Sequence, residues 1–284
     1  MDLKRLVEVR NKVADGVRYD NESRDFVFDF SQDGKSDIIK LCNTIYESKF
    51  YGRTLFFGYE FEPFVDKNVR KDFIKELKFG NKIKQSDKDR FIMKVGTDLD
   101  QAINLASYDV FVVPESSSNL NFEIEQHLSR LARPKYIKYE LIKSMPKDIS
   151  FDYESFEHNV LSKTINGKPR YSETNKRKVL DVIDDLMDKI HNLDYFSIAK
   201  EVKMKYRPYI MNYYQFKTKD EETAFKRLNE SNILVFDDIM TSGTTMQLIL
   251  KTIHNLKNFK SSSNKVTVFS LLGRNFLKKD SNDA

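Results

Sequence analysis

Residues 231–247 read SNILVFDDIMTSGTTMQ, and this stretch predicts the fold class. Ile233 to Phe236 is apolar at every position, which is typical of a strand buried on both faces at the centre of a parallel sheet. Asp237 and Asp238 follow at the carboxyl end of that strand, where open α/β sheets bind their ligands. Two adjacent carboxylates would repel each other in a dry core, so we expect a polar ligand to meet them.

The residues that follow the acidic pair are small and rich in hydroxyl groups, and a segment with helical spacing begins at Met246. Backbone N–H groups at such a helix start favour a phosphate, while the carboxylates can accept hydrogen bonds from sugar hydroxyls. The pattern therefore predicts a site for a phosphorylated sugar. The alternative is a plain strand-to-helix turn in which Asp238 or a nearby hydroxyl caps the helix. The loop consists of Thr241, Ser242, Gly243, Thr244 and Thr245.

The string ILVFDDIMTSGTT, Ile233 to Thr245, resembles the signature of type I phosphoribosyltransferases at every position. The resemblance implies an α/β fold with a central, mostly parallel sheet flanked by helices. It also implies that phosphoribosyl pyrophosphate (PRPP) binds with Mg²⁺, with the ribose 2- and 3-hydroxyls on Asp237 and Asp238 and the 5-phosphate in the following loop. Both carboxylates would then stabilise the positive charge that develops on the anomeric carbon when pyrophosphate leaves.

A second loop follows another expected strand, Val110 to Val113, and precedes the helical pattern of Leu120 to Leu131. In the resembled family the loop after the first core strand grips the pyrophosphate. Three serines after a strand equally suit a plain turn or a helix N-cap, so both interpretations stay open. The candidate binding residues of this loop are Glu115, Ser116, Ser117 and Ser118.

Three cationic residues are further candidates for phosphate binding. Lys143 follows the strand-like segment Lys135 to Ile142, and a cation there could neutralise pyrophosphate or simply face solvent. Lys168 and Arg170 belong to Ser162–Lys178, whose Gly, Pro and polar composition matches the hood loop that closes over PRPP in the family. A solvated linker is the alternative for this segment.

The resemblance covers residues 106–275, which we interpret as a phosphoribosyltransferase-like core, followed by a polar tail at 276–284. Residues 1–105 lie outside it and are expected to form an N-terminal α/β extension that shapes the acceptor pocket. The strands expected in this extension are Phe26 to Phe30, Leu55 to Phe61 and Arg90 to Val95, and the helices are Ile38 to Tyr46 and Val69 to Leu77.

The overall composition is that of an ordinary soluble protein. The 284 residues carry 48 basic and 43 acidic side chains, a net charge of +5 that is compatible with phosphorylated substrates and with nucleic acid. A single cysteine, Cys42, excludes an internal disulfide and a cysteine metal cluster, and the four histidines lack metal-ligand spacing. There is no long apolar run and no secretory signal pattern, so we expect a cytoplasmic protein without membrane contact.

These features predict a pentosyltransferase that forms or breaks an N-glycosidic bond to a nucleobase-like acceptor. One alternative is a regulator that senses PRPP or nucleotides without catalysis and binds nucleic acid or protein. Another is glycosyl transfer to an unusual acceptor, such as a modified base in DNA. The expected partners are a phosphosugar and the acceptor, with nucleic acid and a homodimer left open.

Overall fold

The computed structural model describes residues 16–20, 22–29, 39–50, 53–61, 65–80, 82–116, 118–132, 136–165, 168–240, 243–256, 259 and 263–273. The chain divides into two compact units. Unit 1 is formed by Met1–Glu140, Leu228–Ser242 and Lys260–Ala284, and unit 2 by Leu141–Arg227 and Gly243–Phe259. The protein is α/β, with a mostly parallel central sheet flanked by helices, as the sequence predicts.

The sheet of unit 1 has its parallel strands at the centre. β5, β12, β13 and β4 pair side by side in parallel, whereas β3 pairs antiparallel with β4, and β1 pairs antiparallel with β3 and β2. β6 lies beyond β5 and continues from unit 1 into unit 2. The strands are β1 (Gly16–Asp20), β2 (Asp25–Asp29), β3 (Ile39–Phe50), β4 (Arg53–Phe61), β5 (Val110–Pro114), β6 (Ile137–Lys143), β12 (Asn232–Met240) and β13 (Lys265–Gly273).

β12 occupies the central position that its apolar run predicts. Val235 pairs with Val112 of β5 on one side and with Val268 of β13 on the other. Every residue from Ile233 to Phe236 is fully buried, as expected for a strand at the centre of a parallel sheet. The prediction of a central parallel strand is therefore confirmed.

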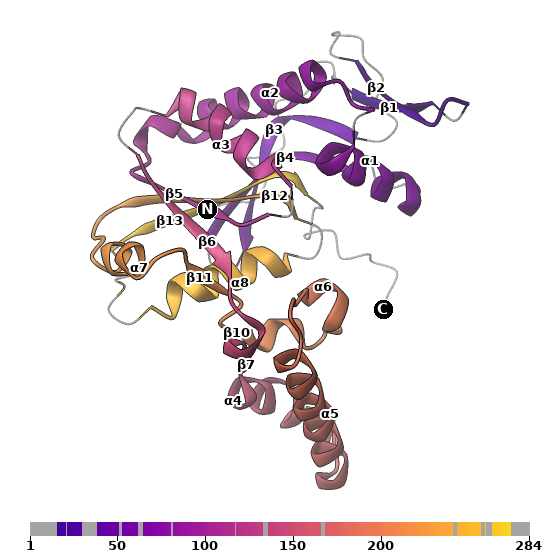
Figure 1. Cartoon of the computed structure of the whole chain (residues 1–284), viewed down its shortest axis with the longest axis vertical. Coiled ribbons are helices and arrows are strands. Elements are labelled where there is room, and N and C mark those ends of the chain that lie inside the picture. The colour runs from indigo at the N-terminus through magenta and orange to yellow at the C-terminus, as the bar shows by residue number, and fades with distance from the viewer. Residues whose placement is uncertain are drawn as a thin grey trace. The chain divides into compact units, whose positions relative to one another are not determined.

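Three long helices complete unit 1: α1 (Lys67–Phe79), α2 (Gln85–Ile103) and α3 (Leu120–Leu131). The Asp66 carboxylate caps α1 by accepting hydrogen bonds from the N–H groups of Asn68 and Val69. α2 and α3 lie side by side (Figure 1). Phe91 of α2 stacks on Tyr59 of β4, whose hydroxyl donates to the Phe91 carbonyl at 2.6 Å. α2 thus packs directly on β4, which comes from the N-terminal part of the chain.

Two predictions for the N-terminal region are wrong. Arg90 to Val95 was expected as a strand but lies within α2, where Phe91, Ile92 and Val95 share the buried face of a helix that also buries Leu99. Ile38 to Tyr46 was expected as a helix, but Ile39–Phe50 is strand β3, held by its antiparallel pairing with β4. Short apolar runs fit either element, and tertiary pairing decides between them.

The other predicted N-terminal elements are found, namely the strand Leu55 to Phe61 in β4 and the helix Val69 to Leu77 in α1. The strand Phe26 to Phe30 corresponds to β2, apart from Phe30, which lies outside the described residues. The compact units do not follow the predicted division at residue 105, because β4 pairs with β13 and unit 1 continues to Glu140. The predicted tail, 276–284, also lies outside the described residues.

Unit 2 combines short strands and helices with one helix of 19 residues, Glu173–His191, and in its aromatic core Phe156 contacts the rings of Phe151, Tyr206 and Tyr209. Three antiparallel pairs occur in it: β11 with the end of β6, β10 with β7, and β8 with β9. Its elements are β7 (Ser150–Phe151), α4 (Tyr153–Phe156), β8 (Thr164–Ile165), β9 (Lys168–Pro169), α5 (Glu173–His191), α6 (Ile198–Glu201), β10 (Ile210–Met211), β11 (Tyr214–Phe216), α7 (Lys219–Lys226) and α8 (Thr244–His254). In the part of the chain that the structure describes, no helix has the length and apolarity needed to span a bilayer.

Candidate functional site

The acidic pair occupies the sixth and seventh of the nine residues of β12. Asp237 and Asp238 are only 6% and 2% exposed. The strand does not end before them, as the sequence pattern suggests, but continues to Met240, because β13 still pairs with it through Gly273. Two adjacent acids are therefore held inside the sheet rather than in a mobile loop.

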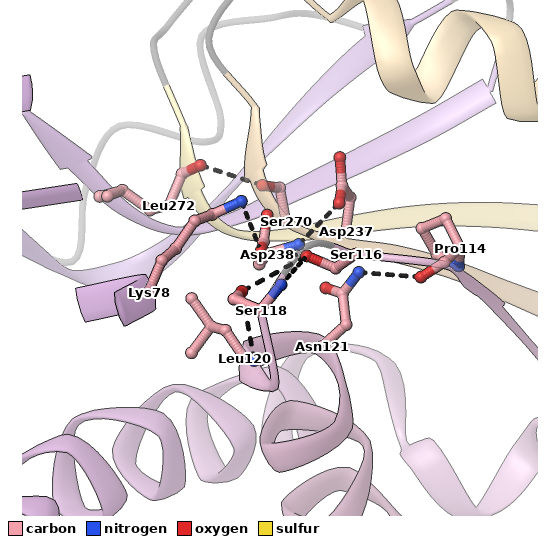
Figure 2. A network of polar contacts seen from close by, with 10 residues as sticks. All are labelled: Lys78, Pro114, Ser116, Ser118, Leu120, Asn121, Asp237, Asp238, Ser270 and Leu272. Atoms are coloured by element: carbon pink, nitrogen blue, oxygen red, sulfur yellow. Dashed lines mark hydrogen bonds and ion pairs between the residues drawn. The ribbon is translucent and has the colours of Figure 1, made fainter. Parts of the chain in front are cut away.

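Asp238 is bound by two side chains that come from different parts of unit 1 (Figure 2). Lys78 Nζ, from the last turn of α1, lies 2.7 Å from Asp238 Oδ2. Ser116 Oγ, from the loop after β5, donates to the same oxygen at 3.2 Å. The helix-capping alternative does not describe Asp238, since α8 begins after Gly243 without a side-chain hydrogen bond at its N-cap.

Asp237 is in an environment that disfavours its charge. Burial, followed by repulsion from the neighbouring Asp238, raises the pKa of Asp237 to about 7. Lys78, the Asp238 backbone N–H and the Asn121 amide act in the opposite direction. The Asp238 N–H donates to Asp237 Oδ1 at 3.0 Å. Near neutral pH this carboxyl group can thus exchange a proton or gain a stabilising donor from a ligand.

The loop after β5 supports the start of a helix and also contacts the acidic pair, while its role in pyrophosphate binding stays a prediction. Ser118 Oγ accepts a hydrogen bond from the Leu120 N–H at the start of α3, so Ser118 supports the helix start. Ser116 reaches Asp238 instead, and its oxygen lies 3.4 Å from Ser118 Oγ. Glu115 is exposed, and Ser117 lies outside the described residues. Ser116 therefore joins this loop directly to the acidic pair.

Asn121 is a site residue that the sequence analysis missed. It is 3% exposed, in the first turn of α3, and its Nδ2 donates to the Pro114 carbonyl at 3.1 Å. Its Oδ1 has no hydrogen-bond partner among the described residues. A buried acceptor without a donor is uncommon in folded proteins and indicates a water or ligand group. The one sequence feature that could have pointed to Asn121 is its position in the first turn of a predicted helix that follows the serine loop.

Lys78 was also missed, and no local signal could have revealed it. It is one of several lysines on α1, and only the packing of that helix brings it to β12. Its side chain is 19% exposed, compared with 3% for Asp238, so the ion pair can be reached from solvent on the lysine side.

The loop after β12 extends into unit 2, where Gly243 has φ of 70°. This left-handed conformation favours glycine. Thr244 and Thr245 form the first turn of α8, whereas Thr241 and Ser242 lie outside the described residues. The phosphate-loop assignment therefore stays a prediction.

The three predicted cations all belong to unit 2. Lys143 is the last residue of β6 rather than the residue after it, and its Nζ donates to the Tyr195 hydroxyl at 3.2 Å. Lys168 lies in β9, and the Arg170 guanidinium stands 5.6 Å from the ring centre of Tyr171. The predicted hood loop, Ser162–Lys178, is not continuous loop, because it contains β8 and β9 and its last residues begin α5.

No protein-family model and no curated protein sequence matches this chain. The chemistry of the site must therefore indicate its function. Among the described residues no cluster of three or more His, Cys, Asp or Glu side chains could hold a metal ion alone. Mg²⁺ is commonly bound through one or two carboxylates together with substrate phosphates, so the acidic pair fits an ion that arrives with a phosphorylated ligand.

Proposed function

We propose that the protein is a phosphoribosyltransferase-like enzyme that binds PRPP, or a related 5-phosphosugar, with Mg²⁺ and forms or breaks an N-glycosidic bond. The observation behind this proposal is the pair Asp237 and Asp238, buried in a central parallel strand and joined to the serine loop of β5 through Ser116. A type I phosphoribosyltransferase-like fold is part of the same proposal, supported by the ILVFDDIMTSGTT string and by the left-handed Gly243.

The two carboxylates suit the hydroxyl groups of a ribose. Two adjacent buried carboxylates repel each other as anions, and two sugar O–H groups would each donate to a carboxylate oxygen in addition to the donors already present. The Asn121 Oδ1, which lacks a partner among the described residues, is a further buried acceptor in this polar group. The site therefore offers more acceptors than the described residues use, which is what a polyhydroxylated ligand requires.

In the reaction, the bond between the anomeric carbon and the pyrophosphate oxygen breaks, and a bond to an acceptor nitrogen forms as that nitrogen loses a proton. Positive charge develops on the sugar in between, and Asp237 and Asp238 would stabilise it electrostatically. Bound Mg²⁺ would neutralise the leaving pyrophosphate. Neither aspartate has to act as a nucleophile in this scheme.

A second candidate function is a regulator that binds the phosphosugar without turning it over. The ion pair between Lys78 and Asp238 favours it, because a cation beside Asp238 weakens the negative field that would stabilise a cationic transition state. Transfer to a base in DNA also stays within the proposal.

Thermal unfolding with PRPP plus Mg²⁺, ribose 5-phosphate or a nucleoside monophosphate tests the binding step. A ligand at a hundred times its Kd adds about 2.7 kcal/mol to the free energy of unfolding. Pyrophosphate release with a free base, a nucleoside or DNA then tests turnover. Stabilisation with release indicates a transferase, and stabilisation without release indicates the regulator. No stabilisation and no heat of binding with any of the three ligands would contradict the proposal.

A further inference from the structure

The helix α1 brings a cation to the acidic pair from outside the stretch that resembles phosphoribosyltransferases. The helix is anchored by Phe73 and Leu77, both buried in the core of unit 1. Phe73 packs edge-on against the rings of Phe26 and Phe91. Lys78 follows Leu77 directly, so its backbone is fixed while its long side chain extends to Asp238. This is a rigid support for a charged group.

The ammonium group of Lys78 has hydrogen-bonding capacity to spare. It can donate three hydrogen bonds, and Asp238 is its one polar contact among the described residues. An isolated ion pair at a largely buried position is a weak source of stability, since desolvation offsets most of the attraction. The position of Lys78 is therefore better explained by a ligand than by stability of the fold.

The donors around Asp238 come together on one side of the pair. Lys78 Nζ and Ser116 Oγ both contact Asp238 Oδ2, and Ser118 Oγ lies 3.4 Å from Ser116 Oγ. An ammonium group beside two hydroxyls matches the oxygens of a phosphate or pyrophosphate. The two carboxylates and Asn121 Oδ1 would still accept hydrogen bonds from sugar hydroxyls.

We propose that Lys78 is a binding residue for the pyrophosphate group of the phosphosugar. In the protein without ligand its ammonium is held by Asp238, and on binding it donates to a pyrophosphate oxygen as well. This inference rests on the proposed function and extends it, because it gives the N-terminal part of the chain a direct role in binding the donor substrate rather than only the acceptor.

The test compares Lys78→Met with Lys75→Met, which removes the same charge from an exposed position of the same helix. Calorimetry would measure binding of PRPP with Mg²⁺, inorganic pyrophosphate and ribose 5-phosphate. For Lys78→Met we expect PRPP and pyrophosphate to bind at least about tenfold more weakly, as for loss of a hydrogen bond to a charged group, with a clearly smaller change for ribose 5-phosphate. Lys75→Met should bind all three like the parent.

Two results would overturn the role of Lys78. One is unchanged affinity of Lys78→Met for PRPP and pyrophosphate, and the other is an equal loss for all three ligands, which would indicate a general effect on the site. If the parent protein binds none of the ligands, the proposed function itself fails, and this outcome is distinct from both.

Lys78→Met also leaves the Asp238 carboxylate without its ion-pair partner, which could itself weaken ligand binding. A second comparison separates this effect from the loss of the Lys78 ammonium group. Asp238→Asn is compared with the double variant Asp238→Asn, Lys78→Met, in which the ion pair is absent from both proteins. If Lys78 contacts pyrophosphate, the double variant binds pyrophosphate more weakly than Asp238→Asn. If Lys78 only neutralises Asp238, the two variants bind pyrophosphate equally, which contradicts the inference.

Discussion

Lys78 Nζ lies 2.7 Å from Asp238 Oδ2, although the two residues are 160 positions apart in the sequence. The contact joins the last turn of α1 to the acidic end of β12 and makes the N-terminal part of unit 1 a component of the candidate site. The charge of Lys78 also acts on the neighbouring Asp237, but burial and repulsion from Asp238 outweigh it, so the pKa of Asp237 is raised. The two aspartates are therefore expected to respond differently to substitution.

Replacing Asp237 with Asn should stabilise the protein without ligand, and more so at high pH. The unfolded acid loses its proton near its ordinary value of 3.8, whereas the folded acid keeps it until about 7. The folded state thus binds more protons between these values, and stability falls as pH rises through this window. One pKa unit corresponds to about 1.36 kcal/mol, so Asp237→Asn should gain at least about 1 kcal/mol over the parent at pH 8.5 relative to pH 4.

Urea unfolding at the two pH values measures this difference. Asp72→Asn, the same substitution at an exposed position of α1, is the matched control. An equal stability difference between Asp237→Asn and the parent at pH 4 and pH 8.5 would show that the acid is not disfavoured in the folded protein.

Replacing Asp238 with Asn should destabilise the protein, because Lys78 then loses its carboxylate partner. Removal of one member of a largely buried pair leaves an uncompensated charge, and the partial exposure of Lys78 reduces the cost to about 1 to 3 kcal/mol. The second change Lys78→Met should recover part of this loss. Urea unfolding of the three proteins checks the order, and a stability of Asp238→Asn equal to or above that of the parent would exclude a stabilising ion pair.

Replacing Phe91 with Ala should destabilise unit 1 by about 3 to 5 kcal/mol, since Phe91 is fully buried and stacks on Tyr59 of β4. Met93→Ala, at an exposed position of the same helix, should change stability by no more than about 0.5 kcal/mol. Denaturant unfolding measures both. Equal effects of the two variants would mean that Arg90 to Val95 does not form the helix face that the structure shows.

Limited trypsin digestion tests whether the predicted hood segment, Ser162–Lys178, closes over PRPP. Arg170 is exposed between β9 and α5, so trypsin should cut after it in the protein without ligand. If the segment closes over PRPP, saturating PRPP with Mg²⁺ should slow this cleavage, while cleavage after the exposed Lys219 at the start of α7 serves as the internal control. Equal cleavage after Arg170 with and without ligand would identify the segment as a linker.

The elements that the sequence predicted well are those with a strong local pattern. The apolar run Ile233 to Phe236 is a central parallel strand, and the helix predicted for Leu120 to Leu131 has those bounds in α3. The pattern failed for Arg90 to Val95 and Ile38 to Tyr46, where the apolar residues fit both periods and long-range pairing decides the outcome.

The site was predictable only where its residues are close in the sequence. The acidic pair and the serine loop each follow a recognisable strand, and parallel strands that neighbour each other bring their carboxyl ends to one edge. Lys78 and Asn121 reach the pair through the packing of α1 and α3, which no local pattern encodes. Local sequence patterns therefore do not predict side-chain contacts between residues that are distant in the sequence.

Calorimetric titration of PRPP with Mg²⁺ into the parent and into the double variant Asp237→Asn, Asp238→Asn tests the central claim most directly. The variant keeps the size and hydrogen-bonding capacity of both side chains but removes both charges. A hydrogen bond to a charged group contributes about 1.5 to 3 kcal/mol, and about 1.4 kcal/mol is tenfold in affinity. We expect the parent to bind, and the folded variant to bind at least about tenfold more weakly. Equal binding by both proteins, or no binding by the parent, would contradict a ribose-binding role for the acidic pair.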